Sequence, residues 1–169
     1  MIATETNSAR FKTSFEPVAN TDCTILILGS LPGDASLVQG HYYAHPRNAF
    51  WGIMSQATCT DLNALPFEER YPILLAHQIA LWDVVQSAIR PGSLDSALAH
   101  INPNALSELI FSLPNLSHII FNGQTAAKHG SKLIPGYIKQ SIAPSTSPAH
   151  TLSFDKKLQA WLQLLAHKN

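Results

Sequence analysis

The sequence predicts a single α/β domain built on a parallel β-sheet that helices cover on both faces. Short apolar runs of strand type alternate along the chain with segments of helical pattern, the order that a parallel sheet with crossover helices requires. The leading run is apolar on both faces, which is typical of strands buried between two layers. With 169 residues, 46% of them hydrophobic, the chain can bury such a core without a disulfide or a metal.

Four runs are predicted as strands of this sheet. The first, residues 24–28, has a continuous strand pattern that is apolar on both faces, and it ends at a loop rich in glycine and proline, residues 29–33. The other three also end in polar or glycine-containing segments. They cover residues 79–82, 118–121 and 137–142. Because the carboxyl ends of parallel strands meet at one edge of a sheet, we expect the loops that follow them to form the functional site.

Helices are predicted from apolar positions at helical spacing and from start signals such as Pro and Glu in a first turn. The clearest apolar face lies in the last helix, where Leu158, Trp161, Leu162 and Leu165 recur at helical spacing. A short helix is expected to begin at Asp34. The other predicted helices cover residues 48–56, 66–77, 103–111, 124–133 and 155–167.

Two segments carry weaker patterns. Residues 87–102 are predicted as a long connection that contains one helical turn. Residues 1–20 are expected to be a loosely structured arm ahead of one domain over residues 21–169. The arm is polar and has no apolar core of the kind found in secretory signals, so a cytoplasmic location is expected.

Composition excludes several classes of protein. No apolar run approaches the roughly 20 residues that span a bilayer, so no membrane association is expected. The two cysteines, Cys23 and Cys59, are too few for a disulfide scaffold or an iron–sulfur cluster, and both thiols are expected to be free. The net charge is zero, but six of the eleven Lys and Arg residues and only one of the eleven acids lie after residue 108. A basic face that binds phosphates therefore remains compatible with the overall neutrality.

The segment over residues 41–51, HYYAHPRNAFW, concentrates the side chains that carry chemistry. It holds four aromatic residues, two histidines, an arginine and an asparagine. Aromatic faces beside amide groups suit a planar heterocycle, through stacking and edge hydrogen bonds. We expect Phe50 and Trp51 to belong to the core, and Tyr43 and Asn48 to face a ligand.

Motifs for other activities are missing from the sequence. There is no dinucleotide-binding glycine fingerprint, no phosphate-binding loop of the nucleotide hydrolases and no nucleophile elbow. His41 and His45 could share a metal ion only on a helix, which Pro46 disfavours. We therefore expect neither a metal nor a cofactor. An esterase that uses Ser30 or Ser145 stays as a remote alternative.

Five segments in this order resemble the uracil-DNA glycosylase superfamily, and most closely its hypoxanthine (deoxyinosine)-DNA glycosylase branch. The most specific of them is YYAHPRNAFW, which is similar to a string in the mismatch-specific uracil/thymine glycosylases. The resemblance extends over about residues 24–165. It implies a three-layer fold with a four-stranded parallel sheet, action on DNA containing deaminated bases, and no cofactor. A monomer is expected as the default for an enzyme that must wrap a DNA strand. The segments lie at residues 26–37, 42–51, 80–98, 119–127 and 143–150.

The resemblance also implies roles for individual residues. Asn48 is implied to hold the attacking water, because Leu31 stands where the mismatch-specific branch has an asparagine; Asp34 is a second candidate. Tyr43 would stack on the flipped base, while Asp83 and Asn122 would bind its polar edge. A group of backbone N–H donors would support the base as it leaves. These donors are expected around Gly29, Ser30 and Gly33.

The last motif, residues 143–150, is expected to press on the DNA backbone. It has Ala143 where the uracil-specific branch has a histidine, which favours a purine-directed or broad activity over fast uracil excision. No lysine is evident as a Schiff-base nucleophile, so a monofunctional enzyme is expected. The residues expected to contact DNA are His45, Arg47, Ser145, Thr146, Ser147, Pro148, Ala149 and His150.

Two alternatives share this fold. One is a mismatch-type uracil or thymine glycosylase, which would use the same pocket with a different base edge. The other is a catalytically inactive DNA-binding module, which the loss of the motif asparagine at Leu31 would favour.

Overall fold

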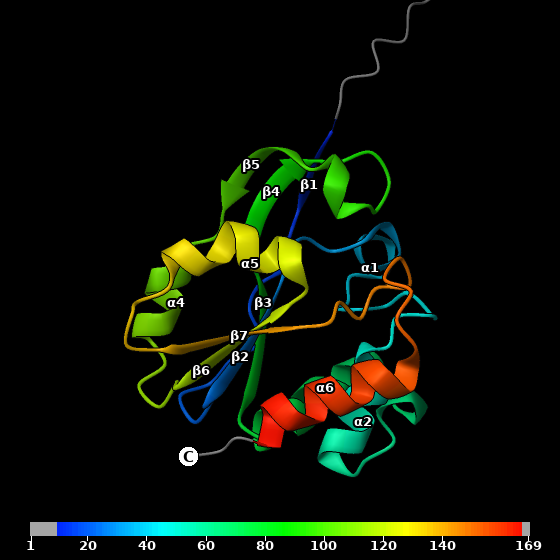
Figure 1. Ribbon diagram of the computed structural model, residues 1–169, viewed down its shortest axis with the longest axis vertical. Coiled ribbons are helices and arrows are strands. Elements are labelled where there is room, and N and C mark those ends of the chain that lie inside the picture. Colours follow the sequence, from blue (N-terminus) through cyan, green and yellow to red (C-terminus); the bar gives the residue numbers. More distant parts are fainter. Residues whose placement is uncertain (1–9, 167–169) are drawn as a thin grey trace, which may run out of the picture.

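A computed structural model describes residues 10–166 of the protein, and it confirms the three-layer α/β prediction. A four-stranded parallel sheet lies between two layers of helices (Figure 1). Its strand order is β3-β2-β6-β7. The strands are β2 (Ile25–Gly29), β3 (Ile79–Asp83), β6 (His118–Asn122) and β7 (Lys139–Ala143).

Each central strand contributes side chains to both faces of the sheet, as their continuous apolarity predicts. Ile25 and Ile27 of β2 face one layer, while Leu26 and Leu28 face the other. The first layer consists of α2 (Phe50–Thr58), α3 (Phe67–Ala76) and α6 (Phe154–Ala166). The second layer contains α4 (Leu106–Phe111) and α5 (Gln124–Gly130).

The remaining helical segments are short. Helix α1 (Asp34–Gln39) follows the first loop and ends at Gly40, whose positive φ of 72° gives the left-handed conformation that favours glycine. Three 3-10 turns connect other elements in the described part of the chain. They are η1 (Leu62–Ala64), η2 (Asp95–Ala97) and η3 (Ser131–Leu133).

A second, antiparallel sheet corrects the expected connection over residues 87–102. It has the order β1-β4-β5, with β1 (Phe11–Thr13), β4 (Val85–Ile89) and β5 (Ala99–Pro103). The segment escapes recognition because β5 is largely exposed and pairs with β4 through shifted registers. Its composition, AHINP, is poor in the residues that favour strands. Strands and helices therefore do not alternate throughout the chain.

The N-terminal arm also differs from the expectation where the structure describes it. Residues 11–13 pair with Ser87–Ile89 instead of remaining loose, and Val18 forms a bridge with Leu81. Residues 1–9 lie outside the described residues. Cys23 and Cys59 are free thiols, as expected. Over residues 10–166, no helix is long and apolar enough to cross a membrane.

The contact between α5 and the sheet provides a test of the packing. A Cβ placed on Gly130 would lie 2.7 Å from Phe121 Cε1 and 2.7 Å from Val84 Cγ2, and both side chains are buried. We expect Gly130→Ala to lower the free energy of unfolding by about 1–2 kcal/mol, because overpacking outweighs the gain in helix propensity. Gly136→Ala, where a Cβ meets nothing within 4 Å, is the control. Equal effects in chemical denaturation would contradict this packing.

Candidate active site

A cavity of about 670 Å³ opens where the four parallel strands end. The β2–β3 register pairs Gly29 with Asp83, and the β6–β7 register pairs Asn122 with Ala143, so these four strand ends lie along one edge. All four residues line the cavity. The expected convergence of the strand-end loops is thus observed, as the geometry of a parallel sheet requires.

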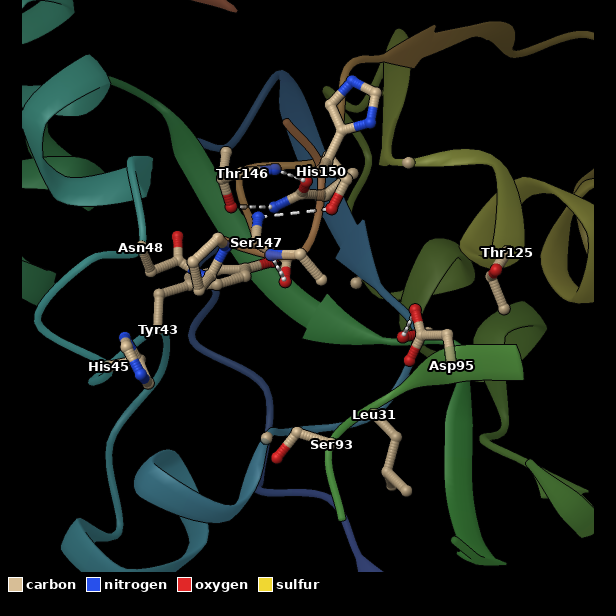
Figure 2. Close-up of a pocket in the computed structure, with 18 of the residues that line it drawn as sticks. Leu31, Tyr43, His45, Asn48, Ser93, Asp95, Thr125, Thr146, Ser147 and His150 are labelled. Atoms are coloured by element: carbon tan, nitrogen blue, oxygen red, sulfur yellow. Dashed lines mark hydrogen bonds between the residues drawn. The ribbon is translucent and has the colours of Figure 1, made fainter. Parts of the chain in front are cut away.

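Most of the candidate residues lie around this cavity, and Arg47 is the exception. Arg47 is exposed and outside the lining, although its neighbours His45 and Asn48 belong to it. In Figure 2, Tyr43, His45 and Asn48 lie on the opposite side of the cavity from Leu31 and Asp95. The other candidates in the lining are Gly29, Ser30, Gly33, Asp34, Asp83, Asn122, Ser145, Thr146, Ser147, Pro148, Ala149 and His150.

The inner part of the cavity is formed by Asp83 and Tyr43, which pack against the backbone of Gly29. A Cβ at Gly29 would lie 2.5 Å from Asp83 Oδ1 and 3.0 Å from the Tyr43 hydroxyl. Only glycine leaves room for both groups at this point. The Tyr43 ring also stacks on Phe50 with 4.0 Å between ring centroids, so one of its faces is already covered. As expected, Phe50 and Trp51 are core residues.

Burial changes the protonation of both inner groups. The pKa of Asp83 is raised to about 7, chiefly because burial disfavours the charged form; the charge of Asp95 adds to the rise and Arg90 opposes it. Burial, reinforced by the Asp83 charge, also raises the pKa of Tyr43, so this phenol keeps its proton. Perturbed carboxyl groups in a cavity are typical of functional sites.

The loop after β2 is fixed by a buried arginine. Arg90 donates through Nη2 to Pro32 O at 2.6 Å and through Nη1 to Leu31 O at 3.3 Å. Its Nη1 also lies 3.4 Å from Asp95 Oδ1, and Ser30 Oγ donates to the other Asp95 oxygen at 2.8 Å. The loop therefore has a fixed backbone, which is what a set of N–H donors aimed at a departing base needs.

Leu31 packs against the second sheet. Its side chain contacts a small buried cluster with Val85 and Ala88 and is only 6% exposed. An apolar residue here anchors the loop on β4 and offers no group that could hold water.

Thr146 differs from the DNA contact expected for it, and it forms a pair with Asn122. Asn122 Nδ2 donates to Thr146 Oγ1 at 2.9 Å, and Thr146 N donates to Asn122 Oδ1 at 2.9 Å. Thr146 is 1% exposed, and its carbonyl accepts from Ala49 N at 3.0 Å. Thr146 is therefore directed into the protein and away from a DNA backbone. The pair instead joins the end of β6 to the last motif and to the start of α2.

The rest of the last motif rests on α6. Trp161 Nε1 donates to Pro144 O at 2.9 Å, and Lys157 Nζ donates to Ser147 O at 3.1 Å. Lys157 is buried, which lowers its pKa, and no acid pairs with it among the described residues. Ala149 and His150 are exposed at the rim. A fixed loop backed by a cation suits contact with phosphates.

The two candidates for holding water have different surroundings. Asn48 Oδ1 accepts from Phe50 N at 3.0 Å, which satisfies one free N–H at the start of α2. An amide oxygen has two lone pairs, so Oδ1 can still accept a hydrogen from water. Asp34 is half exposed and forms an ion pair of 2.6 Å with Lys12 of β1. Asn48 is the better placed of the two, because no cation competes for its oxygen.

Sequence reasoning missed three residues that shape the site. They are Arg90, Asp95 and Lys157, and they interact mostly with backbone groups or with each other. Arg90 and its two carbonyl partners are 58 and 59 residues apart in the sequence. Their spacing carries no motif. The one available signal is that Arg90 directly follows a strand. That signal could be used only if β4 and the second sheet had been recognised in the sequence. Within residues 10–166, no group of three or more His, Cys, Asp or Glu side chains could hold a metal ion.

Comparisons with known proteins agree with this geometry. Residues 16–166 match the family model of the uracil DNA glycosylase superfamily. A hypoxanthine DNA glycosylase from Methanosarcina barkeri is 33% identical over 90% of this chain and 96% of its own. One from Methanosarcina acetivorans is 32% identical over 92% and 99%. A solution NMR structure of a candidate uracil DNA glycosylase from Methanosarcina acetivorans has a TM-score of 0.80 and 32% identity, covering 94% of this chain and all of that one.

The buried arginine gives a testable consequence. Arg90→Met keeps the length of the side chain but removes the donors of the Leu31 and Pro32 carbonyls. We expect the free energy of unfolding to fall by about 2–4 kcal/mol, since each unpaired buried carbonyl costs about 1–3 kcal/mol. Chemical denaturation measures this, with the exposed Arg47→Met as the matched control. An unchanged midpoint in Arg90→Met would show that the loop does not depend on this residue.

Proposed function

The chain belongs to the uracil DNA glycosylase superfamily and is a DNA N-glycosylase, and from this premise we propose that the base it removes is hypoxanthine in deoxyinosine. The proposal is carried by the relatives named hypoxanthine DNA glycosylase, which are 32–33% identical over at least 90% of this chain. The cavity supports it, because Asp83, Tyr43 and Asn48 surround a space that suits a flipped purine.

In the proposed reaction, the deoxyinosine leaves the base stack and enters the cavity. Unstacking costs a few kcal/mol, and least at a mismatch. The rim residues Ser145, Ser147, Ala149 and His150 are proposed to contact the backbone of the displaced strand, with Lys157 adding positive charge from below. Pro148, His45 and Arg47 are proposed as further DNA contacts at the same rim.

Hydrolysis then breaks the bond between C1′ and the base. The sugar becomes oxocarbenium-like, and negative charge moves onto the base. Backbone N–H groups in the fixed loop from Gly29 to Gly33 are proposed to stabilise that charge, as in other sites that bind a developing anion. Asn48 Oδ1 orients the water that attacks C1′, and the products are a free base and an abasic site. Neither a metal nor a cofactor takes part in this scheme.

The enzyme is proposed to act as a monomer, which is the default for an enzyme that must wrap a DNA strand. A cytoplasmic location is proposed together with the DNA substrate. Residues 21–169 are proposed as the catalytic domain, together with the β1 segment that pairs with β4.

A uracil-directed activity is the second candidate. It is favoured by the structural relative named as a candidate uracil DNA glycosylase and by the shared lactam edge of uracil and hypoxanthine. The absence of an imidazole at the Ala143 position speaks against fast uracil excision. Duplexes that differ only in one deoxyinosine, deoxyuridine or deoxyxanthosine distinguish these candidates.

The water-holding role of Asn48 can be tested on the deoxyinosine duplex. Asn48→Ala is expected to lower the single-turnover rate of strand cleavage after alkali by about 100-fold or more, because the attacking water loses its acceptor. Asn63→Ala, at an exposed asparagine, is the matched control and is expected to match the unaltered protein. Full activity in Asn48→Ala with loss in Asp34→Asn would transfer the role to Asp34.

The absence of lysine from the cavity lining predicts a monofunctional enzyme. No Schiff base with C1′ is then expected, so borohydride added during turnover should leave the protein free of DNA. A denaturing gel measures this, with a bifunctional glycosylase as the positive control. A stable protein–DNA adduct would contradict the hydrolytic scheme.

A further inference from the structure

The inner end of the cavity holds a buried carboxyl oxygen that lacks a hydrogen-bond partner. Among the described residues, no hydrogen bond reaches Asp83 Oδ2. Buried polar atoms in native proteins are nearly always paired, so unpaired ones that line a cavity are candidates for ligand contact. Asp83 is 3% exposed and occupies the end of β3 beside the cavity.

Burial and the charge of Asp95 outweigh the charge of Arg90, which favours the ionised form of Asp83. The nearest guanidinium, that of Arg90, spends its N–H groups on Pro32 O, Leu31 O, Gly92 O and Asp95. Asp95 itself is a second acid, on η2, whose charge acts against ionisation of Asp83. The other titratable groups that face Asp83 are the hydroxyls of Tyr42 and Tyr43, which stay neutral because burial raises the pKa of both.

The side-chain amide of Asn122, the other candidate for the base edge, is partly engaged by the protein. In this structure both amide atoms of Asn122 bind Thr146, at 2.9 Å each. A base with a lactam edge, such as hypoxanthine, offers an N–H donor next to a C=O acceptor. A carboxylate can only accept, so it would bind the N–H and place its charge against the C=O. A carboxylic acid offers a donor and an acceptor side by side and matches both atoms.

We infer that Asp83 binds the flipped base as a carboxylic acid, with its O–H donating to the lactam oxygen and its C=O accepting from the lactam N–H. This inference rests on the proposed function and names the chemistry of its substrate edge. Asp83 is then a binding residue whose proton must be present before the base is seated. The proton stays on Asp83 throughout, so the step breaks no covalent bond.

Binding through the neutral acid makes excision depend on pH in a defined direction. The Asp83 pKa of about 7 places the change near neutrality. Above that pH the neutral fraction falls about tenfold for each pH unit, and the rate of excision at subsaturating enzyme is expected to fall with it. Below pH 6 the acid is almost entirely neutral and the rate is expected to level off.

The test is a pair of pH profiles from 5.5 to 8.5 on the same deoxyinosine duplex. The unaltered protein is expected to lose activity above pH 7, by about tenfold between pH 7.5 and 8.5. Asp83→Asn offers a donor and an acceptor at every pH. Its rate, normalised to its own value at pH 5.5, is expected to stay flat over this range. Ionisation of the base or the DNA affects both profiles equally, so the comparison isolates residue 83.

A second variant keeps the test decisive if Asp83→Asn does not fold. Asp95→Asn removes the acid that disfavours ionisation of Asp83, so the alkaline loss is expected to shift to lower pH. Parallel profiles for the unaltered protein and Asp83→Asn, or no shift in Asp95→Asn, would overturn the inference while leaving the glycosylase intact. Failure to excise hypoxanthine at any pH would instead refute the proposed function.

Discussion

The buried guanidinium of Arg90 is the interaction on which the site depends most. Arg90 directly follows β4, a strand of the small antiparallel sheet. Its guanidinium donates to two carbonyls of the loop that follows β2, a strand of the large parallel sheet. A buried cation is stable only when its donors are satisfied, and here loop carbonyls and one carboxylate satisfy them. If the loop moved, the buried guanidinium would lose its acceptors. Arg90 therefore fixes the loop and the two sheets relative to one another.

The opposite side of the cavity is held in the same manner. The Asn122–Thr146 pair, Trp161 and Lys157 fix the last motif through its backbone groups, so its shape does not depend on a ligand. Between these two fixed loops the protein leaves Asp83 Oδ2 unpaired. An unpaired buried polar group lowers the free energy of unfolding. A base that forms a hydrogen bond with that group regains the lost free energy on binding. Rigid loops around unsatisfied polar atoms are what a site that holds a flipped base needs.

The large sheet could be predicted from the sequence because its three inner runs, in β2, β3 and β6, are apolar on both faces and end in loop signals, as in residues 24–33. The convergence of Asp83, Asn122 and the first loop follows from the parallel arrangement alone. The second sheet could not be predicted, since β5 is exposed and its residues, His100 and Pro103 among them, disfavour strands. Arg90 and Asp95 were missed for the same reason. The Thr146 side chain is directed into the protein because it pairs with Asn122. No local sequence pattern specifies that pairing.

The most direct test of this account is the structure of the protein bound to a duplex that carries 2′-fluoro-deoxyinosine, which resists cleavage because fluorine destabilises the oxocarbenium-like sugar. We expect the flipped base in the cavity, with its N1–C6 edge on the Asp83 carboxyl group and C1′ within one water molecule of Asn48 Oδ1. A base that lies with the opposite edge toward Asp83, or that remains stacked in a duplex bound elsewhere on the protein, would contradict it.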